Sequence, residues 1–331
     1  MQTKLASPTL ITAFAPSPHV QAGGSTVSET RFLAVDGGQI AYDDTGGNGP
    51  LILAIPGMGD LRSEYRLLRP GLQGAGYRVV TMDVRGFGET SARWNDYSAH
   101  AVGSDALALI EHLKAGSAVI LGNSFAAGSA LWAAHDAPAR VSGVVLLGPI
   151  VRDLKVPWFA KLALRIGFAG PWRVWFWTTY WNSLFPARKP ADQDQVKGAL
   201  TRNLREPGRI AALQAMIGLS KADTAAIVSR SRVPALVVMG TRDPDFPDAL
   251  AEARWLAAQL HADSLIVNGA GHYPHTEMPE RVAPKLLSFI AECHRNNLDG
   301  KLESVFQHQA MDARCALDLR MSEEAEDHSF V

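Results

Sequence analysis

The sequence predicts an α/β protein whose sheet is mainly parallel and carries helices on both faces. Short apolar runs bounded by Gly, Pro or Asp recur along the chain, as buried strands do. Helical patterns separate most of the later runs, and this alternation builds parallel sheets. The chain has 331 residues, which suits one large domain or a core with one insertion.

The predicted strands are apolar runs at residues 32–35, 40–43, 51–55, 78–83, 118–121, 143–147, 235–239 and 265–267. Helical patterns occupy residues 62–75, 99–114, 125–136, 247–260 and 280–293. The first two runs are separated by Asp36, Gly37 and Gly38, a turn sequence typical of a β-hairpin. We therefore expect an eight-stranded sheet that begins with an antiparallel edge.

The alternation breaks once, between residues 147 and 233. This stretch of about eighty residues has no strand signal and is far longer than a simple crossover needs. It contains five of the eight tryptophans, between Trp158 and Trp181. We predict a helical cap at residues 151–228, inserted into a core formed by residues 31–150 and 229–293.

The two ends of the chain differ from the core in composition. Residues 1–30 are rich in Ala, Ser, Thr and Pro, and we expect a flexible leader. Its apolar run is too short for a secretory signal, and no stretch is long and apolar enough to span a membrane, so a cytoplasmic location is expected. Residues 294–331 are polar, and residues 311–331 hold six acids against two bases. This composition predicts a disordered or loosely attached tail.

Charge and cysteine content exclude several classes of protein. The chain has 32 Lys and Arg against 33 Asp and Glu, a net charge of −1. This balance argues against a generally basic nucleic-acid binder. Cys293 and Cys315 have no Cys/His ladder around them, so neither a disulfide scaffold nor a zinc module is expected. We predict no metal and no other cofactor, and the sequence leaves the oligomeric state open.

A serine stands where one predicted strand turns into a helix. The run at residues 118–121 leads into residues 122–126 (Gly-Asn-Ser-Phe-Ala), and a helical pattern follows. A serine on such a tight turn is held in a strained conformation with its hydroxyl exposed above the sheet. The helix N-terminus adds free N–H groups that favour an oxyanion. These features predict that Ser124 is a catalytic nucleophile.

A serine nucleophile needs a base, and the base needs a third group that orients it. Asp243 follows the predicted strand at residues 235–239, and His272 follows the one at residues 265–267. Sites in open α/β sheets form at the carboxyl ends of the strands, so these loops can converge. The order Ser124, Asp243, His272 is the one expected of a hydrolase built on such a turn.

Neighbouring residues compete for two of these roles. Asp245 and Asp153 are alternative acids, and we favour Asp243 because it comes first after its strand. His275 is the alternative base, and we favour His272 because the glycines before it suit a sharply turned functional loop.

These motifs resemble those of the α/β-hydrolase superfamily, in its serine-nucleophile branch with a helical cap. The resemblance covers roughly residues 30–293. The motifs that carry it are residues 55–59 (Ile-Pro-Gly-Met-Gly), 83–88 (Asp-Val-Arg-Gly-Phe-Gly), 122–126, 240–243 (Gly-Thr-Arg-Asp) and 271–272 (Gly-His). Two positions depart from the family pattern: Pro56 replaces a histidine found in many members, and Ala126 replaces a glycine found in most. Both departures leave the backbone donors available.

The resemblance implies an α/β-hydrolase fold and a catalytic triad of Ser124, Asp243 and His272. It also implies an oxyanion hole formed by the backbone N–H groups of Met58 and Phe125. The implied function is a cofactor-independent serine hydrolase that cleaves an ester, thioester or lactone of a mostly apolar small molecule through an acyl-enzyme. Two alternatives stay open. One is a hydrolase of carbon–carbon bonds that acts on an anionic ring-fission-type substrate, and the other is a slow-turnover ligand receptor on the same fold.

The predicted cap is basic. Residues 152–228 contain twelve Lys or Arg and five Asp or Glu, a local charge of +7. One interpretation is an aromatic-lined lid over an apolar substrate, with arginines near an anionic group. A second is peripheral contact with an anionic membrane surface, with the tryptophans at the interface. A third is that the tryptophans pack the cap onto the core and the bases are solvated.

Overall fold

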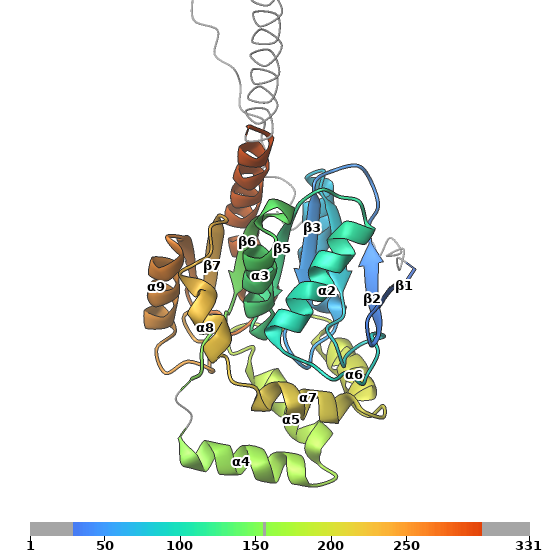
Figure 1. Ribbon diagram of the computed structural model, residues 1–331. Helices are drawn as coiled ribbons and strands as arrows, with labels where there is room; N and C mark the ends of the chain where they lie inside the picture. The colour runs from blue at the N-terminus through green and yellow to red at the C-terminus, as the bar shows by residue number, and fades with distance from the viewer. Residues whose placement is uncertain (1–28, 155–156, 300–331) are drawn as a thin grey trace, which may run out of the picture. The chain divides into compact units, whose positions relative to one another are not determined.

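The computed structural model of the protein describes residues 29–154 and 157–299. Residues 1–28 of the predicted leader and residues 300–331 of the predicted tail lie outside the described residues. Within the described chain, one eight-stranded sheet has the order β1-β2-β4-β3-β5-β6-β7-β8 (Figure 1). The predicted mainly parallel sheet is confirmed.

All eight predicted runs form strands. Their bounds are β1 (Arg31–Val35), β2 (Gly38–Asp44), β3 (Leu51–Ile55), β4 (Arg78–Met82), β5 (Ala118–Asn123), β6 (Val141–Leu147), β7 (Ala235–Gly240) and β8 (Asp263–Val267). β2 pairs antiparallel with both β1 and β4, which confirms the antiparallel edge. The other neighbouring strands are parallel, so their carboxyl ends meet at one edge of the sheet.

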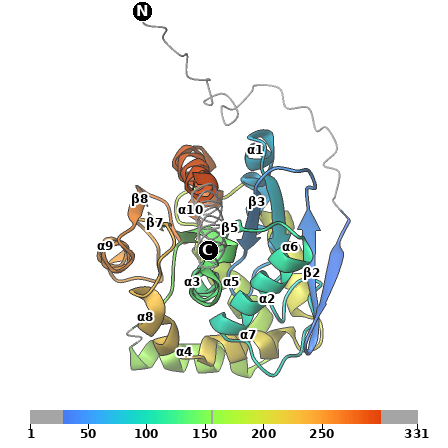
Figure 2. The ribbon, with the colours of Figure 1, turned by 45° about the horizontal axis from the view of Figure 1, so that its top comes forward.

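Helices cover both faces of the sheet. They include α1 (Arg69–Gly74), α2 (Ala99–His112), α3 (Phe125–Asp136), α9 (Ala249–Leu260) and the short α10 (Pro274–Glu277). Figure 2 shows α1 on one side of the sheet and α2 and α3 on the other. Residues 279–290 are also helical. Residues 294–299, which the sequence assigned to the polar tail, are helical as well.

The helix predicted at residues 62–75 is two shorter elements. A 3₁₀ helix spans Arg62–Leu67, and α1 begins at Arg69 with Pro70 in its first turn. The prediction of one helix was wrong because a proline lacks the N–H that would continue the ladder, and its ring clashes with the carbonyl four residues earlier.

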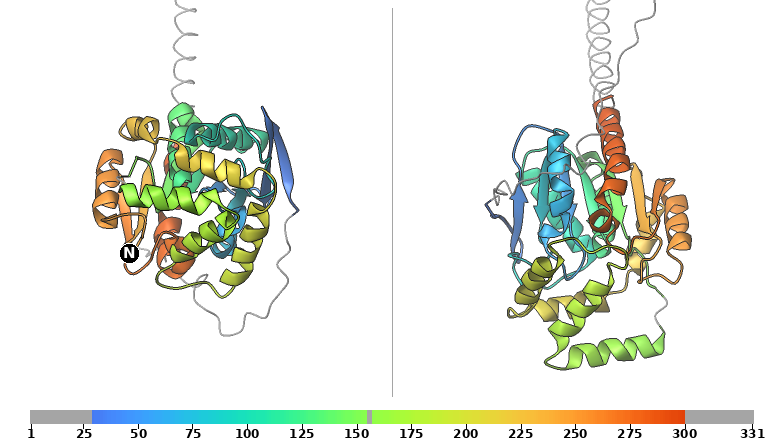
Figure 3. Two further views of the ribbon diagram at one scale, coloured as in Figure 1. Left: turned by 90° about the horizontal axis from the view of Figure 1, so that it is seen from below. Right: turned by 180° about the vertical axis from the view of Figure 1, so that it is seen from behind.

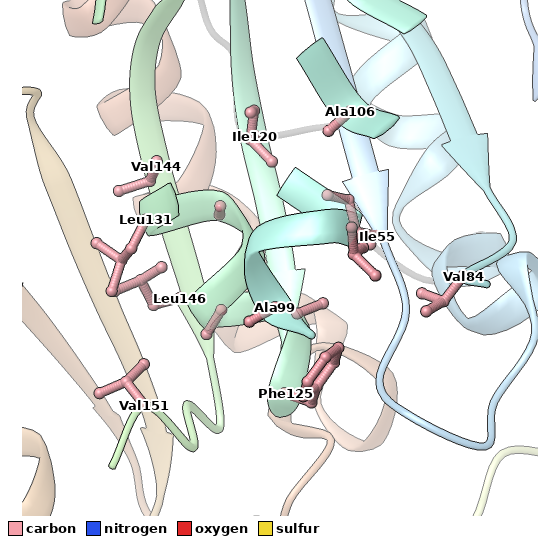
Figure 4. Close-up of a cluster of buried hydrophobic side chains, with 14 of the residues drawn as sticks. Ile55, Val84, Ala99, Ala106, Ile120, Phe125, Leu131, Val144, Leu146 and Val151 are labelled. Atoms are coloured by element: carbon pink, nitrogen blue, oxygen red, sulfur yellow. The ribbon is translucent and has the colours of Figure 1, made fainter. Parts of the chain in front are cut away.

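The hydrophobic core lies between the central strands and the helices α2 and α3. Every residue of β3 and of β5 is buried, because helices cover both faces, and this explains why these strands are continuous apolar runs. In Figure 4, Leu131 and Ala106 lie near Ile120 and Val144 of the sheet. The turn that carries Ser124 therefore begins on a strand that is buried along its whole length.

Within the described residues, five helices occur between β6 and β7. They are α4 (Trp158–Ala169), α5 (Arg173–Ser183), α6 (Gln193–Leu204), α7 (Arg209–Gly218) and α8 (Ala222–Val228). We call α4 to α7 the cap helices, and seen from below they lie across the end of the sheet (Figure 3, left). No helix in the described part of the chain is long and apolar enough to cross a membrane.

Candidate active site

Ser124 lies on a strained turn between β5 and α3. Its backbone has φ 56° and ψ −121°, a region that residues other than glycine rarely adopt. The end of β6 and the segment after it hold this turn in place. The N–H of Ser124 donates to the carbonyl of Leu147 at 2.8 Å, and its own carbonyl accepts from the N–H of Ile150 at 3.1 Å.

Gly122 permits the close approach of strand and helix at this turn. A Cβ at this position would lie 2.3 Å from the carbonyl oxygen of Ala126, which no side chain can tolerate. Ala126 itself is buried in the core, so its methyl group is accommodated where most family members have glycine.

His272 and Asp243 form a buried hydrogen-bonded pair. Nδ1 of His272 lies 2.7 Å from Oδ2 of Asp243. Because β7 ends at Gly240 and β8 at Val267, both side chains stand in loops just beyond the carboxyl ends of adjacent strands. Gly148 lies directly against the pair, since a Cβ there would be 3.2 Å from Nδ1 of the imidazole. The fold therefore brings the predicted base and the predicted acid together.

The two alternative acids are placed differently. Oδ2 of Asp245 lies 3.5 Å from Nδ1 of His272, farther than that of Asp243. The other oxygen of Asp245 accepts the hydroxyl of Tyr180 on α5. Asp153 accepts hydrogen bonds from the segment between α7 and α8 and makes no described contact with the imidazole. The distances therefore favour Asp243 as the partner of the base, with Asp245 as a second carboxylate nearby.

His275 belongs to a different buried cluster. Its Nε2 lies 2.9 Å from Oε1 of Glu64, and its ring stacks on Tyr65 at a centroid distance of 5.2 Å. Burial lowers the pKa of His275 to about 3, so the ring is neutral at neutral pH. A base that is buried behind the site and never charged there does not suit proton transfer to a substrate.

The environment of His272 strengthens it as a base. Burial lowers the pKa of this imidazole, but the carboxylates of Asp243 and Asp245 together outweigh burial and raise the pKa to about 9. Burial raises the pKa of Asp245 above its ordinary value. A protonated His272 is stabilised by the carboxylate of Asp243 at hydrogen-bond distance.

The two expected oxyanion donors come from two different segments beside Ser124, the start of α3 and the loop after β3. Phe125 is the first residue of α3, so its N–H has no acceptor four residues earlier in the helix. Met58 follows Gly57, and a Cβ at Gly57 would lie 3.3 Å from Cβ of Ser124. The loop after β3 therefore packs against the serine turn, and Met58 lines the same cavity as Ser124.

Two buried acids that the sequence did not indicate hold the loop after β3. Oε2 of Glu64 accepts the N–H of Gly57 at 3.0 Å, and Oδ2 of Asp60 accepts the indole N–H of Trp181 at 2.8 Å. Burial raises the pKa of Glu64 to about 8 and that of Asp60 to about 7. The only sequence signal for these roles is that both acids follow closely on the motif at residues 55–59.

The protonated Glu64 is expected to make stability fall as the pH rises. Its pKa is about 8 in the folded chain against an ordinary 4.5, so its stabilising contribution is complete below about pH 4.5 and is lost as the pH rises through 8. Glu64→Gln keeps an acceptor for Gly57 but has no proton to lose. In urea unfolding, the parent should lose on the order of a few kcal/mol more than Glu64→Gln between pH 5 and pH 9. If the free energy of unfolding changed equally with pH in the two proteins, the raised pKa of Glu64 would be contradicted.

Ser124 and His272 line one large cavity of about 1150 Å³. Its walls come from the loops at the strand ends and from the cap helices. The apolar lining includes Leu154, Leu164, Phe176, Trp177, Leu184 and Phe246. No arginine is among the described lining residues, which weakens the interpretation that arginines hold an anionic group there.

Helix α5 is joined to the loops of the site. The indole N–H of Trp177 donates to the carbonyl of Gly59 at 3.2 Å, and that of Trp181 donates to Asp60. Just after α5, the carbonyl of Leu184 accepts the N–H of His272 at 3.0 Å. Trp177 and Trp181 therefore pack the cap helices onto the core, as the third interpretation expected. Trp158, Trp172 and Trp175 are exposed instead.

The same loops contain the one described cluster with metal-ligand potential. Ligand atoms of Asp243, Asp245 and His272 lie within 4.8 Å of one another. Each group already has a hydrogen-bonding role here. Asp243 accepts from the backbone N–H of Asp245 at 3.0 Å, and Tyr180 donates to Asp245. These hydrogen bonds occupy the ligand atoms and orient the imidazole. A catalytic metal site also keeps a free coordination position, so the arrangement suits the orientation of an imidazole better than the binding of a metal.

A protein-family model described as alpha/beta hydrolase fold matches residues 50–279. The chain belongs to the α/β-hydrolase family. The match includes the loop after β3, the serine turn and the loops of Asp243 and His272. The resemblance read from the motifs is confirmed.

Curated relatives of this α/β hydrolase include enzymes of ester and lactone chemistry. The 3-oxoadipate enol-lactonase 2 of Acinetobacter baylyi is 24% identical over 215 residues, which cover 62% of this chain and 75% of that protein. A probable esterase of Oryza sativa subsp. japonica is 27% identical over 259 residues, which cover 74% of this chain and 92% of that protein.

Solved structures confirm the α/β-hydrolase fold. An enol-lactonase from Burkholderia xenovorans LB400 has a TM-score of 0.66 and 21% identity and covers 79% of this chain and 100% of that chain. A bromoperoxidase from Bacillus anthracis has a TM-score of 0.69 and 18% identity and covers 80% of this chain and 100% of that chain.

Proposed function

We propose that this α/β hydrolase is a cofactor-independent serine hydrolase that cleaves an ester, thioester or lactone of a mostly apolar substrate. The observation that carries the proposal is Ser124 on a strained turn, lining an apolar cavity with a histidine that is bonded to a buried carboxylate. Relatives named as an enol-lactonase and an esterase support a carboxylic ester or lactone as the bond that is cleaved.

The proposed reaction is acyl transfer in two halves. His272 accepts the hydroxyl proton of Ser124 as Oγ attacks the carbonyl carbon, and the N–H groups of Met58 and Phe125 donate to the oxyanion. His272 then gives this proton to the leaving alcohol or thiol, which leaves an acyl-serine. Water attacks the acyl carbon with His272 again as the base, and the acid and the free serine are released. Asp243 holds the tautomer with hydrogen on Nδ1 and offsets the charge of the imidazolium.

We further propose that residues 151–228 act as the cap of a core formed by residues 31–150 and 229–293. The helices in this segment form walls of the cavity. The hydrogen bonds from α5 to the loop after β3, and from His272 to Leu184, join the cap to the catalytic loops. The substrate would therefore lie between the cap helices and the strand ends, with its apolar part against the aromatic and aliphatic lining.

A series of p-nitrophenyl esters with increasing acyl length tests the reaction and the substrate class together. We expect turnover that requires Ser124 and a KM that falls as the acyl chain lengthens, because each added methylene is removed from water in the cavity. Turnover without any dependence on acyl length would contradict the apolar cavity as the binding site. Turnover at no more than one event per protein molecule would favour the receptor alternative.

The pH dependence of hydrolysis is expected to reflect the raised pKa of His272. Below its pKa the imidazole is protonated and cannot accept a proton, so kcat/KM should rise about tenfold per pH unit and level off above the pKa. The midpoint should lie above the ordinary value of 6.5 and towards 9. Asp245→Asn should lower the midpoint, because it removes one of the carboxylates that raise the pKa of His272. A parent midpoint at or below 6.5 in the pH–rate profile would contradict this assignment.

The carbon–carbon hydrolase alternative has less support. An anionic ring-fission substrate needs cationic side chains around it. Lys221 is the one Lys or Arg among the described lining residues, and Asp153 and Asp245 line the same cavity. Burial lowers the pKa of Lys221 from its ordinary value. A vinylogous diketone that is not cleaved while esters are cleaved would separate the two functions.

A further inference from the structure

Helix α4 turns an apolar face to the solvent. Among the described residues, six of the nine exposed large apolar side chains lie between residues 158 and 175. We call these six the α4 face: Trp158, Phe159, Leu162, Ile166, Trp172 and Trp175. The first four lie on one side of α4, because their spacing keeps them within an arc of about 100° around the helix axis. Trp158 is 75% exposed and Trp175 is 68% exposed.

The opposite side of the same helix faces the interior. Leu164 lines the cavity that holds Ser124, and Phe168 is buried against Phe176 of α5. In Figure 1, α4 lies at the lower edge of the described chain, outside α5 and α7. The apolar residues of the α4 face are therefore not needed to pack this helix onto the protein. Large apolar side chains gathered on an exposed face in this way mark an interaction surface.

The segment of the chain that carries the α4 face has charges of one sign. The sequence from residue 154 to residue 191 contains no Asp or Glu. Its six bases are Lys155, Lys161, Arg165, Arg173, Arg188 and Lys189. Arg165 and Arg173 are exposed, and neither makes an ion pair with a described carboxylate. Their positive charge is therefore available to an external anion.

We propose that the α4 face docks on the surface of an anionic lipid bilayer. Tryptophan prefers the boundary between lipid and water because its ring is apolar and its N–H is polar. An amphipathic helix that carries aromatic residues and bases lies in this boundary, and each base near an anionic surface adds attraction. A second copy of the chain is a poorer occupant, because two copies of this face would bring like charges together.

The docked helix would place the outer wall of the cavity against the lipid. The same few turns of α4 carry Leu164 on the inner side and Trp158 and Ile166 on the outer side.

Binding to lipid does not depend on the proposed reaction, so Ser124→Ala should bind vesicles as well as the parent does. Failure of esterase activity and failure of membrane binding are thus separate results.

Flotation of the full chain with vesicles tests the proposal. The probes are vesicles of phosphatidylcholine alone and of phosphatidylcholine mixed with phosphatidylserine. We expect the parent to float with the mixed vesicles and to be released by salt, because screening weakens the attraction between the bases and the lipid. Trp158→Ser combined with Ile166→Ser should abolish flotation. Arg165→Gln should weaken binding about fivefold, the effect of one base near an anionic surface.

Matched controls test whether the loss of binding is specific to residues of the α4 face. Phe32→Ser, on β1, also removes an exposed apolar side chain, and Arg254→Gln, on α9, also removes an exposed base. Both controls should float like the parent. Equal flotation of the α4-face variants and the parent would overturn the proposal. So would a dimer, seen by light scattering, that Trp158→Ser dissociates, because a second copy would then cover the face.

Discussion

Ser124→Ala is expected to lower turnover of a p-nitrophenyl ester by roughly 10⁴- to 10⁶-fold, because it removes the hydroxyl that forms the acyl-enzyme in the proposed reaction. Only the hydroxyl group is removed, and backbone hydrogen bonds to Leu147 and Ile150 hold the strained turn. The fold should therefore remain intact. A fluorophosphonate probe should add its mass to the parent and not to Ser124→Ala.

A nearby serine provides the control for this result. Ser129 is buried on α3, five residues further along the chain, and it takes no part in the proposed chemistry. Ser129→Ala should keep both labelling and turnover within a few-fold of the parent. If Ser124→Ala were labelled and turned over like the parent, the nucleophile assignment would be wrong.

Asp243→Asn is expected to lower kcat by about 10⁴-fold, because an amide can no longer hold the imidazole in the tautomer with hydrogen on Nδ1. Asp245→Asn should have a much smaller effect, since its oxygen lies 3.5 Å from Nδ1 and that of Asp243 lies 2.7 Å away. Single-turnover kinetics of the two variants measure the difference at the chemical step.

The two substitutions are matched in size and in loss of charge, so a difference between them reports only the position of each carboxylate relative to the imidazole. Thermal unfolding checks that both variants fold. A larger loss in Asp245→Asn than in Asp243→Asn would make Asp245 the catalytic acid. Equal losses would show that the two carboxylates act as a unit, and the double variant would then lose no more than either single one.

Much of the fold was predictable because its signals are local. A strand covered on both faces must be apolar along its whole length, so runs such as residues 51–55 and 118–121 indicated strands directly. The helix predicted at residues 62–75 was wrong because the apolar pattern continues through Pro70 although the backbone ladder cannot. The side-chain pattern there favours one continuous helix, but the missing N–H of Pro70 interrupts the hydrogen bonds that such a helix needs.

The candidate site was predictable to the extent that each residue follows its own strand. Parallel strands bring their carboxyl ends to one edge, so Ser124, Asp243 and His272 could be placed together without any measured distance. The choice between Asp243 and Asp245 needed the structure, because the two residues share a loop and differ only in their distance to the imidazole. The burial of Glu64 beneath the loop after β3 also depends on contacts far apart in the chain.

Residue patterns alone predicted the α/β class, the order of the strands along the chain, and a candidate nucleophile, acid and base that each follow a strand. These features follow from residue patterns within a few positions of one another. Three features needed the folded structure: which acid lies closer to the imidazole, which tryptophans pack against the core and which ones are exposed to solvent. Burial and distance depend on how segments far apart in the chain pack together, so a local residue pattern does not contain them. The five tryptophans between Trp158 and Trp181 look equivalent along the chain, and only packing divides them.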